Sequence, residues 1–207
     1  MLYAGLDLGQ AADRTALIIA EQGGLQPAYS YDVRHIERPP LGVPYPAIVG
    51  LVAERMARIP RTPLVVDGTG VGRAVVDLFR QIKGLELVPV LITAGDTATR
   101  DDAGYWRVPK RDLVGVVQVL LQSKRLRYSD QLADVRTLMN ELATFKATIT
   151  TAGHDTYAGS DWRTGAHDDL VLSLALCLWY AEREARFRVP AIGPIGMWRP
   201  APWGKRE

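Results

Sequence analysis

The chain has 207 residues, of which 47% are hydrophobic, and a formal net charge of only +2 at pH 7. This composition indicates one globular domain, or one domain with a tail. It excludes a polybasic nucleic-acid binder, and no apolar run approaches the ~20 residues of a membrane span.

The cysteine count and the start of the chain bear on the compartment. The single cysteine, Cys177, excludes an intramolecular disulfide and a cysteine zinc cluster. The chain begins directly with a strand-like stretch, without the basic region and cleavage site of a signal peptide. We therefore expect a cytoplasmic protein.

The first stretch, residues 2–9, has the alternation of a strand. Its apolar side chains fall on one face, and Asp7 falls on the other between Gly5 and Gly9. Glycine in a strand often marks the close approach of a ligand or another backbone. Asp7 is therefore predicted to be a carboxylate with open space beside it, although a strand-end aspartate that caps a turn explains the pattern equally well.

The following segments predict a mixed α/β fold. Short loops join the first three strands, which indicates an antiparallel meander, and helices around the next two strands indicate parallel crossovers. The predicted strands are 2–9, 15–20, 26–36, 64–67 and 85–93, and the predicted helices are 47–59, 73–83, 109–124, 131–145 and 170–186. We further expect a loop over 94–106, an extended segment over 125–129 and a small hairpin formed by 146–150 and 155–158.

Acidic residues recur where these elements end or begin. Asp67 ends a buried strand, and Asp168 and Asp169 open the last helix. Ligands of open α/β sheets bind at the carboxyl ends of the strands, so these acids converge with Asp7 if the two strands are neighbours. Each acid also has a structural explanation: a turn for Asp67, and helix capping or a first-turn charge for the other two.

Converging carboxylates repel each other, and a divalent cation relieves that repulsion. Oxygen ligands without cysteine favour Mg²⁺ or Mn²⁺, as one or two ions. Two such ions about 3.5–4 Å apart activate a water and stabilise a leaving oxygen in phosphodiester cleavage.

Four segments carry a resemblance to a known family. They are GLDLGQAADRTALIIAE (5–21), VVDGTGVGRAVVDLF (65–79), VPKRDLVGVVQVLLQSKRLRY (108–128) and HDDLVLSLALCLWYAE (167–182). Together they resemble the C-terminal nuclease domain of the large terminase subunit of tailed phages, a member of the RNase H-like (retroviral integrase) superfamily. The resemblance implies a five-stranded-core mixed sheet flanked by helices, and metal-dependent cutting of concatemeric DNA during genome packaging.

The resemblance also assigns residues and partners. Asp7, Asp67 and Asp168 match the catalytic, metal-binding acids. Asp169 matches an adjacent, auxiliary acid and is also expected among the metal ligands. The implied partners are double-stranded DNA, an ATPase motor, the portal and the small terminase subunit. The chain has no GxxxxGK[ST] motif, so we expect either an isolated nuclease domain or a stand-alone protein whose motor is a separate chain or missing. We expect a nuclease domain over 1–186, a tail with proline and tryptophan over 187–207 and, for a phage or prophage protein, the host cytoplasm.

Basic residues in loops and at helix starts are candidates for DNA contacts. They are Arg14, Arg73, Arg100 and Lys110. Lys110 lies at a helix start, where a positive charge opposes the helix dipole and indicates an external anion. A solvated surface explains these residues equally well. The glycine-rich turn 68–72 either cradles phosphate or serves only as a tight turn, and His167 either assists the acids or caps the last helix.

Three other functions are compatible with the sequence. A Holliday-junction resolvase of related fold needs the same acids. A sugar-kinase or actin-like ATPase shares the GLDLG stretch but needs two such lobes. In a non-catalytic packaging module the acids would be structural.

Overall fold

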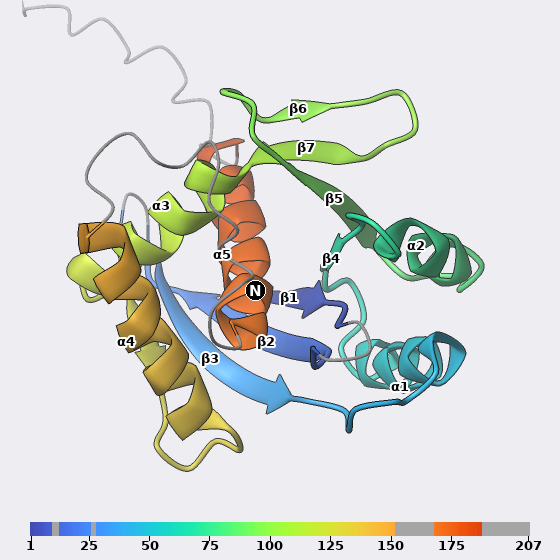
Figure 1. The fold of residues 1–207 in the computed structure, drawn as a ribbon, viewed down its shortest axis with the longest axis horizontal. Helices are drawn as coiled ribbons and strands as arrows, with labels where there is room; N and C mark the ends of the chain where they lie inside the picture. Colours follow the sequence, from blue (N-terminus) through green and yellow to red (C-terminus); the bar gives the residue numbers. More distant parts are fainter. Residues whose placement is uncertain (10–12, 26–27, 152–167, 188–207) are drawn as a thin grey trace, which may run out of the picture.

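The computed structural model describes residues 1–9, 13–25, 28–151 and 168–187, and within them eight strands form one mixed sheet (Figure 1). The sheet order is β6-β7-β5-β4-β1-β2-β3-β8. The strands are β1 (Leu2–Asp7), β2 (Ala16–Gly23), β3 (Ser30–Glu37), β4 (Leu64–Asp67), β5 (Leu87–Thr93), β6 (Thr99–Arg100), β7 (Trp106–Pro109) and β8 (Leu126–Tyr128). The helices are α1 (Tyr45–Ala57), α2 (Gly72–Arg80), α3 (Lys110–Gln122), α4 (Val135–Thr151) and α5 (Asp169–Phe187).

The five central strands have the arrangement that the sequence predicts. β1, β2 and β3 form an antiparallel meander, and β4 and β5 add to β1 in parallel. The mixed, RNase H-like sheet is therefore confirmed. β8 and the β6–β7 pair extend it at its two edges.

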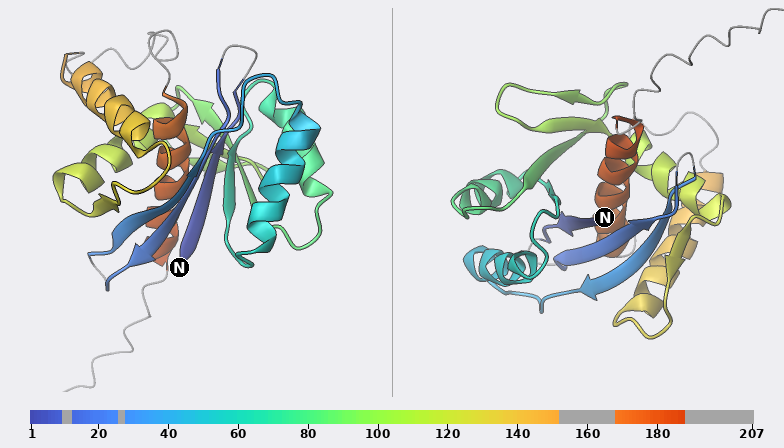
Figure 2. Two further views of the ribbon diagram at one scale, coloured as in Figure 1. Left: turned by 90° about the horizontal axis from the view of Figure 1, so that it is seen from below. Right: turned by 180° about the vertical axis from the view of Figure 1, so that it is seen from behind.

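Helices cover both faces of the sheet and produce two separate cores. α3, α4 and α5 lie on one face, and α1 and α2 lie on the other (Figure 2). β1 shows the alternation directly, because Tyr3 packs in the core under α5 while Ala4 and Leu6 pack in the core under α1 and α2. In the described ranges no helix combines the length and apolarity that crossing a membrane requires.

Gly5 allows α5 to pack directly on the backbone of β1. The Ser173 hydroxyl donates to the Gly5 carbonyl at 2.7 Å, and the Cys177 thiol contacts the Tyr3 carbonyl at 3.4 Å. A Cβ at Gly5 would lie 1.9 Å from the Ser173 carbonyl oxygen. The expected close approach at Gly5 is thus made by a helix backbone, and the open space predicted beside Asp7 is occupied by protein at both flanking glycines. Burial raises the pKa of the Cys177 thiol to about 12, which makes it an unreactive packing residue.

Three local predictions are wrong. The expected loop 94–106 contains β6 and the start of β7. Residues 146–150, expected in a hairpin, continue α4, because each further residue of a formed helix adds a hydrogen bond and outweighs the strand preference of threonine and isoleucine. α4 begins at Val135 rather than at 131, since Asp134 has a φ of 56°, and Asp130 is therefore not its cap. Residues 155–158 and 188–207 lie outside the described residues.

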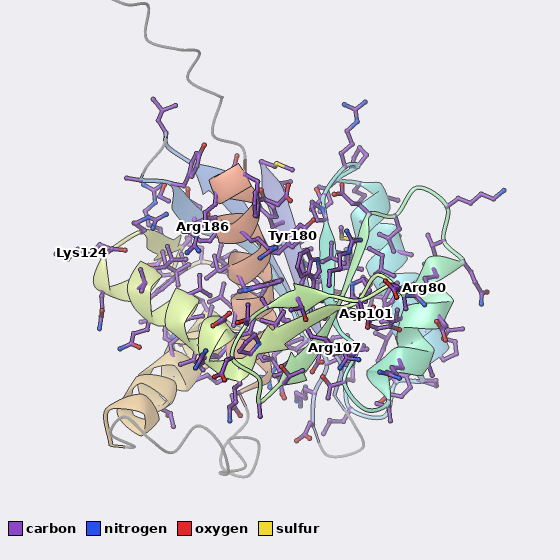
Figure 3. All side chains as sticks on the ribbon, turned by 90° about the horizontal axis from the view of Figure 1, so that it is seen from above. Arg80, Asp101, Arg107, Lys124, Tyr180 and Arg186 are labelled. Atoms are coloured by element: carbon purple, nitrogen blue, oxygen red, sulfur yellow. The ribbon has the colours of Figure 1, made fainter. Side chains whose placement is uncertain are left out.

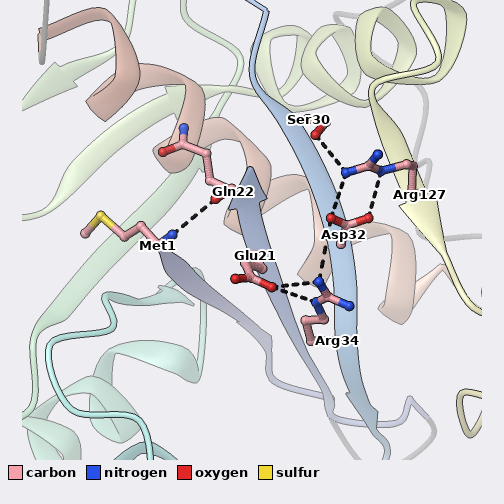
Figure 4. A network of polar contacts seen from close by, with 7 residues as sticks. All are labelled: Met1, Glu21, Gln22, Ser30, Asp32, Arg34 and Arg127. Carbon is pink, nitrogen blue, oxygen red and sulfur yellow. Dashed lines mark hydrogen bonds and ion pairs between the residues drawn. The ribbon is translucent and has the colours of Figure 1, made fainter. Parts of the chain in front are cut away.

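Ion pairs join the strands β2, β3 and β8 on the surface (Figure 4). Arg127 of β8 donates to both carboxylate oxygens of Asp32 on β3, at 2.8 and 2.9 Å. Arg34 of β3 donates to Glu21 of β2 at 2.8 Å. We call these four residues the β3 surface network.

Candidate active site

Asp7 and Asp67 end neighbouring parallel strands at the centre of the sheet. The register pairs Leu6 with Val66, so the two aspartates follow side by side on strands about 4.8 Å apart. By alternation Asp7 shares a face with Tyr3, and Asp67 shares the same face with Val65. Both acids are buried, and both face the layer that contains α5. The register therefore places these two aspartates side by side at the end of the sheet.

The first turn of α5 lies at the same level. Cys177 contacts Tyr3 and Ser173 contacts Gly5, so four residues of helix match two residues of strand. Four residues of helix and two residues of strand both span about 6 Å. One more such step toward the start of α5 leads from Gly5 to Asp7 along β1, so the start of α5 lies beside Asp7. Asp168 immediately precedes α5 and is half-buried, and its carbonyl accepts the Leu172 N–H at 2.9 Å. The helix thus begins where the sequence predicts and carries Asp168 to the carboxyl end of β1.

Asp169 has a different environment. Its Oδ2 accepts hydrogen bonds from the Arg38 guanidinium and from the Arg14 backbone N–H, both at 3.3 Å. Burial raises the pKa of Asp169, and the charge of Arg38 opposes that rise. Both side chains of the pair are about nine-tenths buried. The Asp169 carboxylate therefore ties α5 to the end of β3 and to the segment before β2.

Glu141 is a buried acid beside α5 that the sequence analysis did not single out. Its Oε2 accepts the N–H groups of Leu170 and Val171 at 3.0 and 3.2 Å. Burial raises the pKa of Glu141 to about 7, in spite of these hydrogen bonds and the nearby Arg38. A signal exists in the sequence: Glu141 falls on the stripe of α4 formed by the buried residues Leu138 and Leu142.

The glycine-rich turn after β4 uses its N–H groups internally. The Thr69 N–H donates to Asp67 Oδ1 at 2.8 Å, and the Gly68 N–H donates to the Val90 carbonyl at 2.7 Å. A Cβ at Gly72 would lie 2.3 Å from the Asp67 carbonyl oxygen, and Gly70 has a φ of 62°. Of the two interpretations, these contacts favour the tight turn, which fixes the end of β4, and not the phosphate cradle.

The predicted DNA-contact residues do not form one group. Arg73 and Arg100 are exposed and lie 5.8 and 5.7 Å from the rings of Tyr105 and Trp106, respectively. Tyr105 belongs to the core under α1 and α2, and Trp106 packs against the core under α5. Figure 3 shows Arg80 on α2 and Arg107 on β7. Arg14 lies instead beside α5, and Lys110 is the first residue of α3; both are half-buried.

The side chains around the ends of β1 and β4 determine which metal ion would fit there. Among the described residues, no group of three or more His, Cys, Asp and Glu is arranged to hold a metal ion. His167 lies outside those residues. The pair Asp7 and Asp67 offers hard oxygen donors of the kind that Mg²⁺ and Mn²⁺ prefer, and the start of α5 brings Asp168 to the same end of the sheet. The donor chemistry therefore fits a divalent ion.

No protein-family model matches the sequence, and no curated protein matches it either. Solved structures do match the fold. The large terminase nuclease of the thermophilic phage G20c, with bound zinc, superposes with a TM-score of 0.53 at 18% identity, over 86% of this chain and 79% of that one. The chain has the fold of a terminase nuclease domain.

Two more terminase nucleases support this assignment. The human cytomegalovirus terminase nuclease domain, soaked with manganese and bound to an inhibitor, gives a TM-score of 0.54 at 14% identity, over 90% of this chain and 85% of that one. The nuclease domain of the P22 large terminase gives a TM-score of 0.51 at 12% identity, over 88% of this chain and 86% of that one. The fold implied by the four sequence segments is thereby confirmed.

Proposed function

We propose that the protein is a divalent-metal-dependent DNA endonuclease of the terminase-nuclease type, with Asp7, Asp67 and Asp168 as its catalytic acids. The observation that carries this proposal is the placement of Asp7 and Asp67 side by side at the carboxyl ends of β1 and β4, on the face under α5. Open α/β sheets bind ligands at this end of their strands. The terminase nuclease fold supports the same reaction class.

The residues of the chain have distinct parts in this proposal. Rigid strands hold Asp7 and Asp67, and the first turn of α5 supplies Asp168, so three carboxylates from distant segments serve one or two Mg²⁺ or Mn²⁺ ions. When bound, such ions polarise the phosphodiester and make water a stronger nucleophile. Zinc in the phage G20c structure and manganese in the cytomegalovirus structure support divalent chemistry. Asp169 is auxiliary, because Arg38 and Arg14 engage its Oδ2 and thereby steady Asp168.

The proposed substrate is double-stranded DNA in genome packaging. Arg73 and Arg100, exposed beside Tyr105 and Trp106, would contact the DNA, together with Arg14 and Lys110. An ATPase motor on another chain, the portal and the small terminase subunit are the proposed partners. Residues 1–186 would form the nuclease body, and 187–207 a tail outside it.

Plasmid cleavage tests the proposal. Supercoiled plasmid is incubated with wild type, Asp7→Asn, Asp67→Asn and Asp168→Asn over a titration of Mg²⁺ and Mn²⁺. Loss of a metal-binding carboxylate is expected to lower the cleavage rate by more than about 100-fold. Asp96→Asn is the matched control, because Asp96 is exposed and pairs with Arg111 on the surface; it should cut like wild type.

A melting experiment provides a second readout. Mn²⁺ should raise the Tm of the wild type, because an ion that binds only the folded state adds about 2.7 kcal/mol to the free energy of unfolding at a concentration of 100 times its Kd. Asp7→Asn should lose this shift. The proposal fails if wild type leaves plasmid intact at every metal concentration and Asp7→Asn shows the same Tm shift. Faster cutting of a four-way junction than of linear duplex would favour a resolvase instead.

A further inference from the structure

The first turn of α5 is held by contacts from outside the helix. The first N–H groups of a helix have no partner within it and require one elsewhere. Glu141 of α4 provides that partner for Leu170 and Val171, at 3.0 and 3.2 Å, from 29 and 30 residues away in the sequence. The contact joins two helices of the same layer at the residues that directly follow Asp168 and Asp169.

The surroundings of Glu141 make this contact difficult to replace. Glu141 is 8% exposed, and its second oxygen, Oε1, has no hydrogen-bond partner in the part of the chain that the structure describes. Water is therefore excluded from the carboxylate, so little solvent is available to satisfy the two N–H groups if the side chain is removed.

Arg38 completes the arrangement. It follows β3 and donates to Asp169, so the first turn of α5 is tied to α4 through Glu141 and to the sheet through Arg38. The guanidinium pairs with Asp169, and its charge also acts on Glu141, whose hydrogen bonds come from the helix N–H groups. The geometry thus fixes both the position and the rotation of the turn that carries Asp168.

We propose that Glu141 is a positioning residue for the site: its carboxylate holds the first turn of α5, and with it Asp168, against the ends of β1 and β4. This inference rests on the proposed function. Glu141 itself touches neither DNA nor metal. Removing it displaces Asp168, so it slows cleavage and weakens metal binding without weakening the binding of DNA.

Two variants and a control separate positioning from simple folding. Glu141→Ala removes both hydrogen bonds, Glu141→Gln keeps an oxygen that accepts them, and Asn140→Ala changes an exposed neighbour on the same helix. For plasmid cleavage at matched folded fractions, Glu141→Ala should lower kcat about 10- to 100-fold and raise the Mn²⁺ concentration for half-maximal rate. Its KM for DNA should stay within about twofold, as expected for a group that acts through another. Glu141→Gln should recover most of the rate, and Asn140→Ala should equal wild type.

Amide hydrogen exchange tests the contact without relying on activity. In Glu141→Ala, the Leu170 and Val171 amides should exchange at least about tenfold faster, while the amides in the middle of α5 stay protected. The inference is overturned if folded Glu141→Ala keeps its kcat and its metal requirement, or if these two amides exchange as in wild type. If wild type cuts no DNA while the two amides respond as expected, the nuclease proposal fails and the role of Glu141 in holding the turn stands.

Discussion

Two groups of charged residues along β3 use the same kinds of side chain in opposite surroundings. In the β3 surface network, Arg34 and Arg127 are more than half exposed and pair with Glu21 and Asp32. One residue beyond the strand, Arg38 is 10% exposed and pairs with the buried Asp169, close to Glu141. Exposed ion pairs contribute about 0–1 kcal/mol each, whereas removing one partner of a buried pair costs several.

The difference shows where the fold depends on individual charges. On the surface, each charge has solvent as an alternative partner. At the start of α5, the Asp169 carboxylate pairs with the Arg38 guanidinium, and the Glu141 carboxylate accepts hydrogen bonds from two helix N–H groups. The turn that carries Asp168 thus depends on every member of its cluster, while the β3 surface network tolerates the loss of one.

The largest expected effect comes from separating α5 from the sheet. Gly5→Ala puts a Cβ 1.9 Å from the Ser173 carbonyl oxygen, a clash between two backbones that no side-chain rotation relieves. We expect a loss of more than about 4 kcal/mol in the free energy of unfolding, or no folded protein at all. Gly50→Ala is the control, because a Cβ there meets nothing within 4 Å and α1 should gain about 0.5–1 kcal/mol. Urea unfolding checks both, and equal midpoints would show that α5 does not press on β1.

The next effect compares the two groups directly. Arg38→Ala leaves the Asp169 carboxylate buried without its cation and should cost about 3–5 kcal/mol. Arg127→Ala, in the β3 surface network, should lower the free energy of unfolding by less than about 1 kcal/mol. In 1 M salt this difference from wild type should disappear, because salt screens the exposed pair. Both are measured by urea unfolding at low and high salt. Similar losses for the two variants would remove the distinction between the buried and the exposed group.

The sequence predicts the parts of this comparison that depend on local pattern. Alternation over residues 2–9 places Asp7 opposite the apolar face, and the apolar run 64–67 marks β4 with Asp67 at its end. The apolar helix after Asp168 follows from composition in the same way. Neighbouring strands then bring Asp7 and Asp67 together, because the order of a meander and a crossover leaves β4 beside β1.

The remaining parts depend on contacts between distant segments. Arg38 and Asp169 are 131 residues apart, and nothing near Arg38 in the sequence indicates a buried partner. Glu141 lies on a helix whose start and end were both predicted wrongly, so its face toward α5 could not be assigned. The two-residue strand β6 is too short for alternation to distinguish it from a loop.

The smallest effect is a pH dependence at the start of α5. Burial raises the pKa of Glu141 from 4.5 to about 7, so the folded state holds this proton more tightly than the unfolded chain. The stabilisation is fully present below pH 4.5 and is lost as the pH rises through about 7. The loss amounts to about 2–3 kcal/mol. Glu141→Gln keeps a neutral side chain at every pH.

The measurement is the difference in unfolding free energy between wild type and Glu141→Gln from pH 4 to pH 8. Contributions of groups that do not interact with Glu141 cancel in this difference, whereas Asp169, whose charge raises the pKa of Glu141, is part of the measured response. We expect the difference to decline by about 2–3 kcal/mol between pH 4.5 and 7 and to stay level above. Parallel curves for wild type and Glu141→Gln would mean that water reaches this carboxylate, and the contrast between the buried cluster and the surface network would then not hold for Glu141.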